Sequence, residues 1–489
     1  MRSGRTWLGI VVLAASAAGL STTAAAPATI EGELRERLDA GLTADFVVRF
    51  AEQANLSAAF QMDWQGRGEF VFGKLREVAE RSQAAARAIL DARGVSYQPF
   101  LAGNEIYVRA GDAALATALA ARAEVAVIRA PREVAVAAII EAPRPAGGGE
   151  LPAFGWGLVD SGATTFWSSF GRQGQGIVVA EMTTGVQWDH PALEGAFHCS
   201  DPSDPKCWFD PSNVCGGFAC DTNGHGTAVA GVMVGSDDPG LAYQVGMAPG
   251  AEWIACKGCE SASCSEFALN SCADWLLAPA GNPSNRPHVV AVAWGGGSCD
   301  PWFEDKVYAW RAAGIFAAMG AGNGGSSCTT MSSPGDYQAS FAAAAHDVTR
   351  TACNFSSRGP SCFGDQPFTK PNLSAPGADV CSSIPINDWS CSHADTSLAA
   401  AHVAGATALL WSCASDLMGN VDFTYLALQN TAAPPPAGNC GAPPNSQGNY
   451  TYGYGFLDVQ NAGWAYCQFF LFSDGFETGD TTAWSLTVP

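Results

Sequence analysis

Positive charge is scarce in the larger, C-terminal part of this 489-residue sequence. From residue 146 onward there are 9 lysines and arginines against 30 aspartates and glutamates, whereas residues 27–145 carry 14 and 16. Nucleic-acid binding depends on clustered cations that neutralise phosphates, so this balance argues against a nucleic-acid partner. With 47% hydrophobic and only 15% charged residues, the chain is predicted to be globular with a large core.

No segment after the first 20 residues has the pattern of a membrane-spanning helix. Arg2 and Arg5 precede an apolar run from Trp7 to Leu20, and small residues follow it up to Ala26. The run is shorter than the roughly 20 residues that a membrane-spanning helix needs, and this order of charged, apolar and small residues is typical of a signal peptide. We therefore expect residues 1–25 to be a signal peptide, the protein to be secreted (extracellular or periplasmic), and no membrane partner.

Cysteine is absent from the first 198 residues, and all 17 cysteines lie between Cys199 and Cys467. In an exported protein this pattern predicts disulfides. A metal site at Cys256 and Cys259 is the alternative, but no second close cysteine pair or His-x-His accompanies it. The odd count leaves one thiol unpaired or in an intermolecular bridge. Four pairs close in sequence are expected to form local bridges: Cys199 with Cys207, Cys215 with Cys220, Cys353 with Cys362, and Cys381 with Cys391.

Residues 27–145 have a pattern of their own. Between Leu75 and Ile89, apolar residues recur every three or four positions, which predicts a helix. On either side of this segment, apolar residues have the spacing typical of strands. The predicted order is β-α-β-β-α-β, the ferredoxin-like arrangement. A small domain between a signal peptide and a larger domain suggests a propeptide, with an ordinary accessory domain as the alternative. The glycine-rich linker 143–152 that follows is the expected cleavage site.

Residues 153–467 alternate short apolar strands with helical stretches, which predicts an α/β fold with a parallel sheet and helices on both faces. Active sites of such folds lie at the carboxyl ends of the strands. The tail, 468–489, resembles a short motif at the end of many exported bacterial proteins and is expected to be a flexible end.

Three segments carry the residue types of nucleophilic catalysis. A strand from Ile177 continues through Glu181 and Thr183. His225 stands in a glycine-flanked segment at the expected start of a helix. Ser397 opens a second, apolar helix, whose N-terminus favours a nearby oxyanion.

These segments, in this order, resemble the three signatures of the subtilisin-like serine proteases (the subtilase or peptidase S8 family). The resemblance runs from about Gly155 to Cys467 and includes three further landmarks: residues 246–251, 356–360 and 374–377. It implies a secreted proenzyme that hydrolyses peptide bonds in peptide or protein substrates, with its own propeptide as an intramolecular inhibitor.

The resemblance also implies roles for single residues. Ser397 would be the nucleophile, His225 the base, and Asn323 the side-chain donor to the oxyanion, as acyl transfer requires. The segment Ala293, Trp294 and Gly295 resembles the strand that pairs with substrate, without its usual polar residues. No cofactor is expected, and no metal is expected at Ala192, where calcium-binding members often have an acidic ligand.

Several departures from the family pattern bear on activity. Thr183 stands where the family has the triad aspartate, so it offers the histidine a hydrogen bond but no charge. Glu181, two residues earlier on the same face of the strand, is a possible replacement. Asp395 replaces a glycine beside the nucleophile, where its side chain would crowd the cleft or repel the oxyanion. Ala401 replaces a proline.

Two functions from different classes follow. The first is a serine endopeptidase acting through an acyl-enzyme, attenuated because of Thr183. The second is a catalytically dead pseudoprotease that binds peptides in the same groove. A dinucleotide-binding enzyme is excluded because Gly171, Gly174 and Gly176 precede a strand instead of following one.

Overall fold

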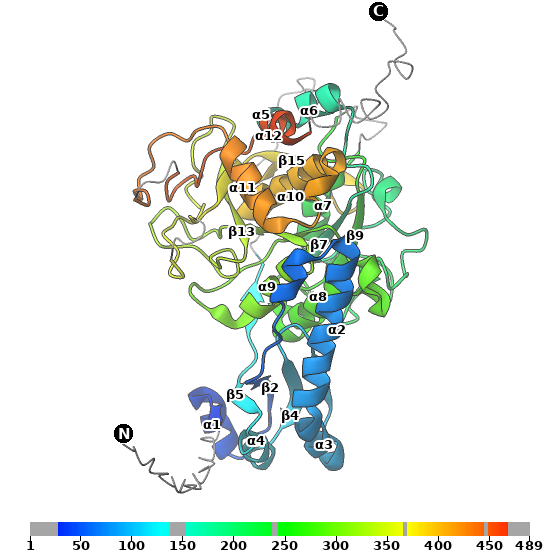
Figure 1. Cartoon of the computed structure of the whole chain (residues 1–489), viewed down its shortest axis with the longest axis vertical. Coiled ribbons are helices and arrows are strands. Elements are labelled where there is room, and N and C mark those ends of the chain that lie inside the picture. The colour runs from blue at the N-terminus through cyan, green and yellow to red at the C-terminus, as the bar shows by residue number, and fades with distance from the viewer. Residues whose placement is uncertain (1–27, 137–152, 237–242, 365–368, 445–447, 468–489) are drawn as a thin grey trace, which may run out of the picture.

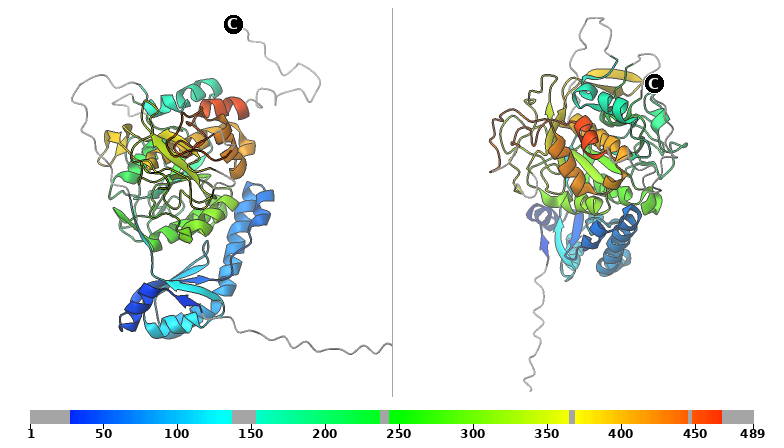
Figure 2. Two further views of the ribbon diagram at one scale, coloured as in Figure 1. Left: turned by 90° about the vertical axis from the view of Figure 1, so that its left-hand side faces the viewer. Right: turned by 45° about the horizontal axis from the view of Figure 1, so that its top comes forward.

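The computed structural model describes residues 28–136, 153–236, 243–364, 369–444 and 448–467. They form a small N-terminal unit, residues 28–136, below a large unit that begins at residue 153 (Figures 1 and 2). The predicted signal peptide, the linker 143–152 and the tail 468–489 lie outside the described residues. None of the helices described in these ranges is long and apolar enough to cross a membrane.

The large unit is built on a seven-stranded sheet in which all neighbouring strands are parallel. This confirms the predicted subtilisin-like α/β class. The strands are almost entirely apolar because helices cover both faces of the sheet. In spatial order they are β14 (Leu373–Pro376), β13 (Phe341–His346), β12 (Phe316–Gly320), β11 (Val289–Val292), β7 (Val178–Thr183), β9 (Glu252–Lys257) and β8 (Trp208–Phe209).

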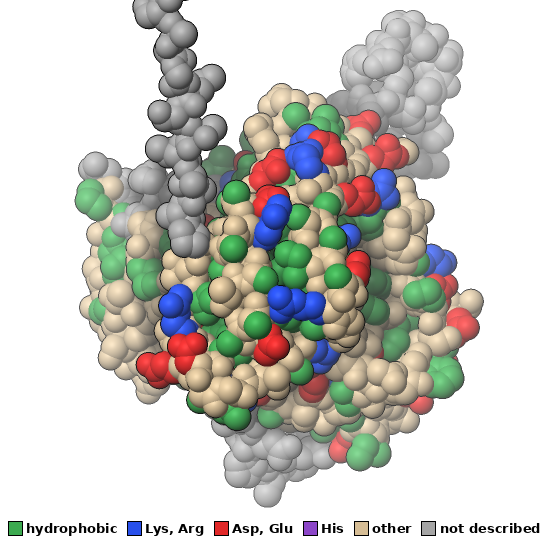
Figure 3. All heavy atoms as spheres, turned by 90° about the horizontal axis from the view of Figure 1, so that it is seen from below, with side chains coloured by type: hydrophobic (Ala, Val, Ile, Leu, Met, Phe, Trp, Pro, Cys, Tyr) green, Lys and Arg blue, Asp and Glu red, His purple; other side chains and the backbone are tan. Residues whose placement is uncertain are grey.

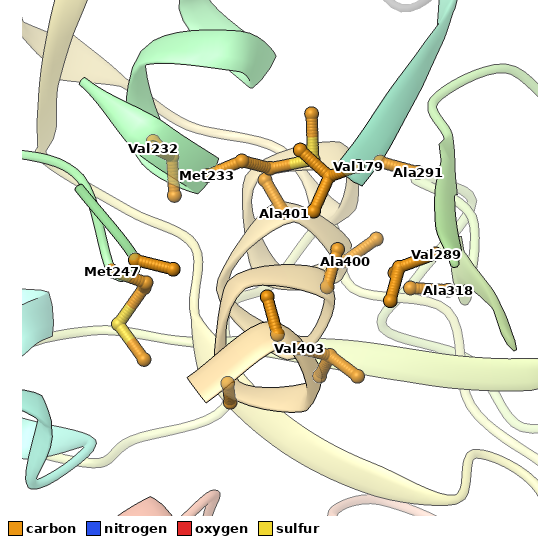
Figure 4. Close-up of a cluster of buried hydrophobic side chains, with 14 of the residues drawn as sticks. Val179, Val232, Met233, Met247, Val289, Ala291, Ala318, Ala400, Ala401 and Val403 are labelled. Carbon is orange, nitrogen blue, oxygen red and sulfur yellow. The ribbon is translucent and has the colours of Figure 1, made fainter. Parts of the chain in front are cut away.

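One face of this sheet packs on α7 (His225–Val234) and α10 (Thr396–Cys413). Figure 4 shows Ala400 and Val403 of α10 between side chains of three strands and of α7. Every residue of α10 except Ser412 is buried, which explains why its sequence is apolar on all sides. The opposite face packs on α8 (Glu266–Leu277) and α9 (Glu304–Ala312).

The N-terminal unit contains a five-stranded sheet in the order β1 (Thr29–Ile30), β5 (Val125–Arg129), β2 (Ala44–Phe50), β4 (Glu105–Gly111) and β3 (Tyr97–Phe100). Its helices are α1 (Gly32–Asp39), α2 (Trp64–Ser82), α3 (Ala84–Arg93) and α4 (Ala113–Ala120). From β2 onward the elements follow the predicted β-α-β-β-α-β order, except that the first helix is divided at Gln83. The surface seen from below mixes basic and acidic side chains (Figure 3).

The face of the small sheet that lacks helices of its own lies against α8 and α9 of the large unit. Arg129 donates to both carboxylate oxygens of Glu266, at 2.7 and 2.6 Å, and Lys306 donates to Glu105 at 2.7 Å. After β5 the chain leaves this sheet, and β6 (Glu133–Ala135) pairs antiparallel with β10 (Ser263–Ser265) of the large unit. The small unit is therefore joined to the large one by ion pairs and by a shared strand ladder.

Eight disulfides link sixteen of the cysteines, all of which lie in the described residues. Three of the four predicted local pairs are present, and Cys256 and Cys259 are both in disulfides. The prediction that Cys353 pairs with Cys362 is wrong: Cys362 is bonded to Cys299, and Cys353 is a buried free thiol. The buried segment between them, whose Ser357 bonds to Gly322, carries Cys362 away from Cys353.

Candidate active site

The predicted site residues lie at or just after the carboxyl ends of the central strands or at the starts of helices. Thr183 is the last residue of β7, His225 the first of α7, and Ser397 the second of α10, while Asn323 follows β12. His225 and Thr183 are fully buried, and Ser397 is 6% exposed. This position agrees with the general rule that active sites of parallel sheets lie at the carboxyl ends of the strands.

The imidazole of His225 is held from both sides. Its Nδ1 lies 3.2 Å from the hydroxyl oxygen of Thr183, and its Nε2 lies 3.0 Å from a carboxylate oxygen of Asp395. Burial alone would raise the pKa of Asp395, but the hydrogen bond and charge of His225 and the amide of Leu398 hold that pKa below its ordinary value. Asp395 is therefore an anion that engages the nitrogen which a serine protease directs at its nucleophile.

Hydroxyl, imidazole and carboxylate thus lie in the order of a catalytic triad with Thr183 at the nucleophile end. Thr183 has no exposed surface, because it ends a central strand under α7. A substrate therefore has no access to its hydroxyl. Ser397, in contrast, lines a cavity.

Asn323 is oriented by the residue before Ser397. Its side-chain oxygen accepts hydrogen bonds from the backbone amide and the hydroxyl of Thr396, both at 3.0 Å. This leaves the amide nitrogen, the donor end, for the cavity that Asn323 lines. A donor so placed beside a helix N-terminus is suited to stabilise an oxyanion. The anion of Asp395, which caps the same helix by accepting from Leu398 at 2.9 Å, opposes a second negative charge there.

A cavity of about 200 Å³ lies beside Ser397. The predicted substrate strand lines it, and so do Ala135 and Val136 at the end of β6 from the N-terminal unit. The amide of Val136 donates to the carbonyl of Ala262 at 2.9 Å, so this segment is held in an extended form up to the cavity. The lining residues are Ala135, Val136, Ala293, Trp294, Gly295, Gly320, Gly322, Asn323, Ser332, Thr396 and Ser397.

Glu181 lies close to this site, but no hydrogen bond joins its carboxyl group to the imidazole of His225. It is fully buried, and within the described part of the chain neither carboxylate oxygen accepts a hydrogen bond. A Cβ atom on Gly226 would lie 3.0 Å from its Oε1, so the carboxyl group lies under the first turn of α7. Burial and the charge of Asp221 raise its pKa well above the ordinary value, against an opposing effect of Lys257. A raised pKa favours the neutral form of the carboxyl group, which makes Glu181 a weaker source of negative charge for His225.

Asp221 is a residue that sequence reasoning missed. One of its oxygens accepts from the hydroxyl of Thr184 at 2.9 Å and the amide of Gly224 at 2.8 Å, and the other accepts from the amide and hydroxyl of Thr227. It therefore ties the end of β7 to the first turn of α7 and fixes His225 between them. An aspartate shortly before a helix start is a signal for such capping.

A serine hydroxyl, an imidazole and an amide donor at the carboxyl ends of a parallel sheet define the serine-peptidase class of site. The chain belongs to the Subtilase family, whose profile matches residues 174–455. It is 36% identical over 326 residues to bacillopeptidase F of Bacillus subtilis (strain 168), a match that covers 63% of this chain and 22% of that protein. Subtilisin DY of Bacillus licheniformis is 30% identical over 50% of this chain and 79% of its own length. Serine protease AprX of Bacillus subtilis (strain 168) is 30% identical over 43% of this chain and 48% of its own length.

Proposed function

We propose that the protein is a serine endopeptidase made as a secreted proenzyme. Its turnover is attenuated because of the surroundings of His225, the general base. The observation that carries this proposal is the cavity shared by Ser397, Asn323 and the end of β6. An extended segment added to a strand edge is the way in which peptides are commonly recognised, and here it leads the chain toward a serine hydroxyl.

In this mechanism the oxygen of Ser397 attacks a substrate carbonyl carbon and gives its proton to Nε2 of His225. The tetrahedral oxyanion accepts hydrogen bonds from Asn323 and from the start of α10. The amine leaves with the proton from His225, and water then hydrolyses the acyl-enzyme. Before the first step, Nε2 of His225 has to give up its hydrogen bond to Asp395 and form one with the hydroxyl of Ser397.

Attenuation follows from where the charges lie. Thr183 keeps a hydrogen bond to Nδ1 but offers no anion to stabilise the imidazolium. Asp395 supplies an anion at the other nitrogen, where it competes with proton transfer. Loss of the triad aspartate alone costs on the order of 10⁴ in turnover in serine proteases.

We assign the N-terminal unit as a propeptide that inhibits the cleft. Its sheet rests on α8 and α9, and its last described residues line the cavity beside Ser397. Secretion is supported by the eight disulfides, which persist in oxidising compartments.

The second candidate is a pseudoprotease that binds peptides without cutting them. The pair between His225 and Asp395 favours it, because a base held by a carboxylate takes no proton from Ser397. A fluorophosphonate probe separates the two functions when applied to purified protein whose N-terminal unit has been removed. We expect slow labelling that Ser397→Ala abolishes and that Ser332→Ala, in the same cavity, leaves intact. An unlabelled but folded protein would leave the pseudoprotease.

A further inference from the structure

The N-terminal unit contacts the large unit at a second place, away from the cleft. The contact is made by an arm that consists of η1 (Ser57–Gln61) and the first turns of α2. In Figure 1 and in the left view of Figure 2, α2 rises from the small sheet alongside the large unit. There the arm packs on η4 (Pro283–Asn285) and α9.

Arg67 is the centre of this contact. Its Nε donates to the carbonyl of Ala312 at 2.9 Å and its Nη2 to the carbonyl of Arg311 at 2.8 Å, while Nη1 donates to Gly419. The first two carbonyls belong to the last turn of α9, which is the negative end of the helix dipole. Arg67 is 5% exposed, so the large unit encloses its guanidinium in a cradle of carbonyl oxygens.

Trp64, one turn earlier on the same face of α2, fills the neighbouring position. Its ring stacks on His288, with ring centroids 4.7 Å apart and an angle of 18° between the planes. The guanidinium of Arg286 lies 3.7 Å from the centroid of the Trp64 ring and donates to the Trp64 carbonyl. The large unit therefore offers one surface for the aromatic ring and another for the cation.

Three glycines make this close approach possible, one on the arm and two on the large unit. A Cβ atom at Gly68 would lie 2.3 Å from Arg286, and one at Gly419 or Gly314 would lie 3.0 or 3.2 Å from the Trp64 ring. A glycine inside a helix destabilises it by about 1 kcal/mol relative to alanine. The close approach of Arg286 explains why α2 has a glycine at position 68 despite this cost. Both sides of the contact are shaped for each other.

We propose that the end of α9, together with Gly419, Arg286 and His288, is a second binding site for the N-terminal unit. The site recognises a tryptophan and an arginine three residues apart on one helix. It holds the unit on the large unit after the connecting chain has been cut, whether or not β6 still lies in the cleft. This inference rests on the proposed propeptide role of the N-terminal unit but requires no catalysis.

The test uses the full chain carrying Ser397→Ala, with residues 146–149 replaced by the recognition sequence of an exogenous site-specific protease. After cleavage, gel filtration and surface plasmon resonance measure how much of the N-terminal fragment stays bound and how fast it leaves. We expect the fragment to co-elute with the large unit, and Arg67→Ala to speed its dissociation about tenfold or more. Arg76→Ala, an exposed arginine on the same helix, is the matched control and leaves the rate unchanged.

Release of the parent fragment immediately after cleavage, or equal dissociation rates for Arg67→Ala and its parent, would overturn the proposal. If Arg67→Ala does not fold, amide hydrogen exchange on the cleaved parent decides. Protection of residues 64–70 and 310–314 at the level of the uncleaved chain supports the second site, and its loss overturns it. Because Ser397→Ala abolishes acyl transfer in every sample, inactivity of the wild-type protein has no bearing on these outcomes.

Discussion

A carboxylate oxygen of Asp395 lies 3.0 Å from Nε2 of His225, and the residue is held there by a second hydrogen bond, which its other oxygen accepts from the amide of Leu398. The carboxylate is thus both the cap of α10 and the partner of the proposed base. Any route to an active serine has to free the imidazole from it.

Replacing Asp395 separates these two roles. Asp395→Asn removes the charge but keeps an oxygen that caps the helix, whereas Asp395→Gly removes both, at a cost of roughly a few tenths of a kcal/mol in stability. We expect both variants to react faster with a fluorophosphonate than the wild type, because Nε2 is released for Ser397. The second-order labelling rate measures this, with thermal unfolding as the check on folding. Labelling that stays at the wild-type rate in both variants would show that Asp395 does not restrain the base.

Restoring a carboxylate at position 183 should depend on Asp395. In the wild-type background, Thr183→Asp places an anion on each side of His225, and we expect a small gain in peptidase rate. In the Asp395→Gly background we expect the same substitution to raise kcat by about 10³ to 10⁴. A double-mutant cycle measures this coupling. Additive effects would contradict it.

Glu181→Gln tests whether the buried carboxyl group assists catalysis. Its folded-state pKa is raised well above the ordinary value by burial and Asp221, so ionisation of Glu181 disfavours the folded state. The wild type should therefore lose stability relative to Glu181→Gln as pH rises from the ordinary glutamate pKa toward the raised one, and the difference should level off above it. Denaturant unfolding at several pH values measures this, with the exposed Glu194→Gln as control. Labelling of Ser397 should not change, and a large loss would mean that Glu181 serves His225.

The position of β6 predicts where the chain first cuts itself. Val136 already lines the cavity with Ser397, and each further residue advances an extended chain by only about 3.5 Å. We expect the first self-cleavage within a few residues after Val136, ahead of the linker 143–152 that composition alone suggests. Intact mass spectrometry of the processed protein gives the site, and Ser397→Ala should stay uncut. A first cut inside the linker would contradict this register.

Cys353 should be the single thiol of the folded protein, and an unreactive one. Burial raises the pKa of this thiol to about 12, so little thiolate is present at neutral pH. Ellman's reagent should detect no thiol in the native protein and one after denaturation without reductant. A reactive native thiol would contradict the burial of Cys353.

The parallel sheet and the positions of Ser397 and His225 at helix starts could be predicted because their signals are local: apolar strands, helix starts and short motifs. Three features could not. The bond between Cys299 and Cys362 joins residues 63 apart and depends on how a buried loop turns. The contact of Asp395 with His225 joins two helix starts that lie 170 residues apart in the sequence. The cradle around Arg67 consists of backbone carbonyl groups. Every residue has such a group, so no pattern of side chains in the sequence predicts this site.

The disulfides differ in what they enclose. Five close loops with separations of 5 to 16 residues, whereas the bond between Cys328 and Cys440 spans 112 residues and encloses Ser397 with the whole of α10. A bond of this span removes more freedom from the unfolded chain than a short one. It also keeps the nucleophile helix tethered during local opening, when other peptidases attack a protein. In a medium rich in such enzymes, this bond would set how long the segment around Ser397 resists proteolysis.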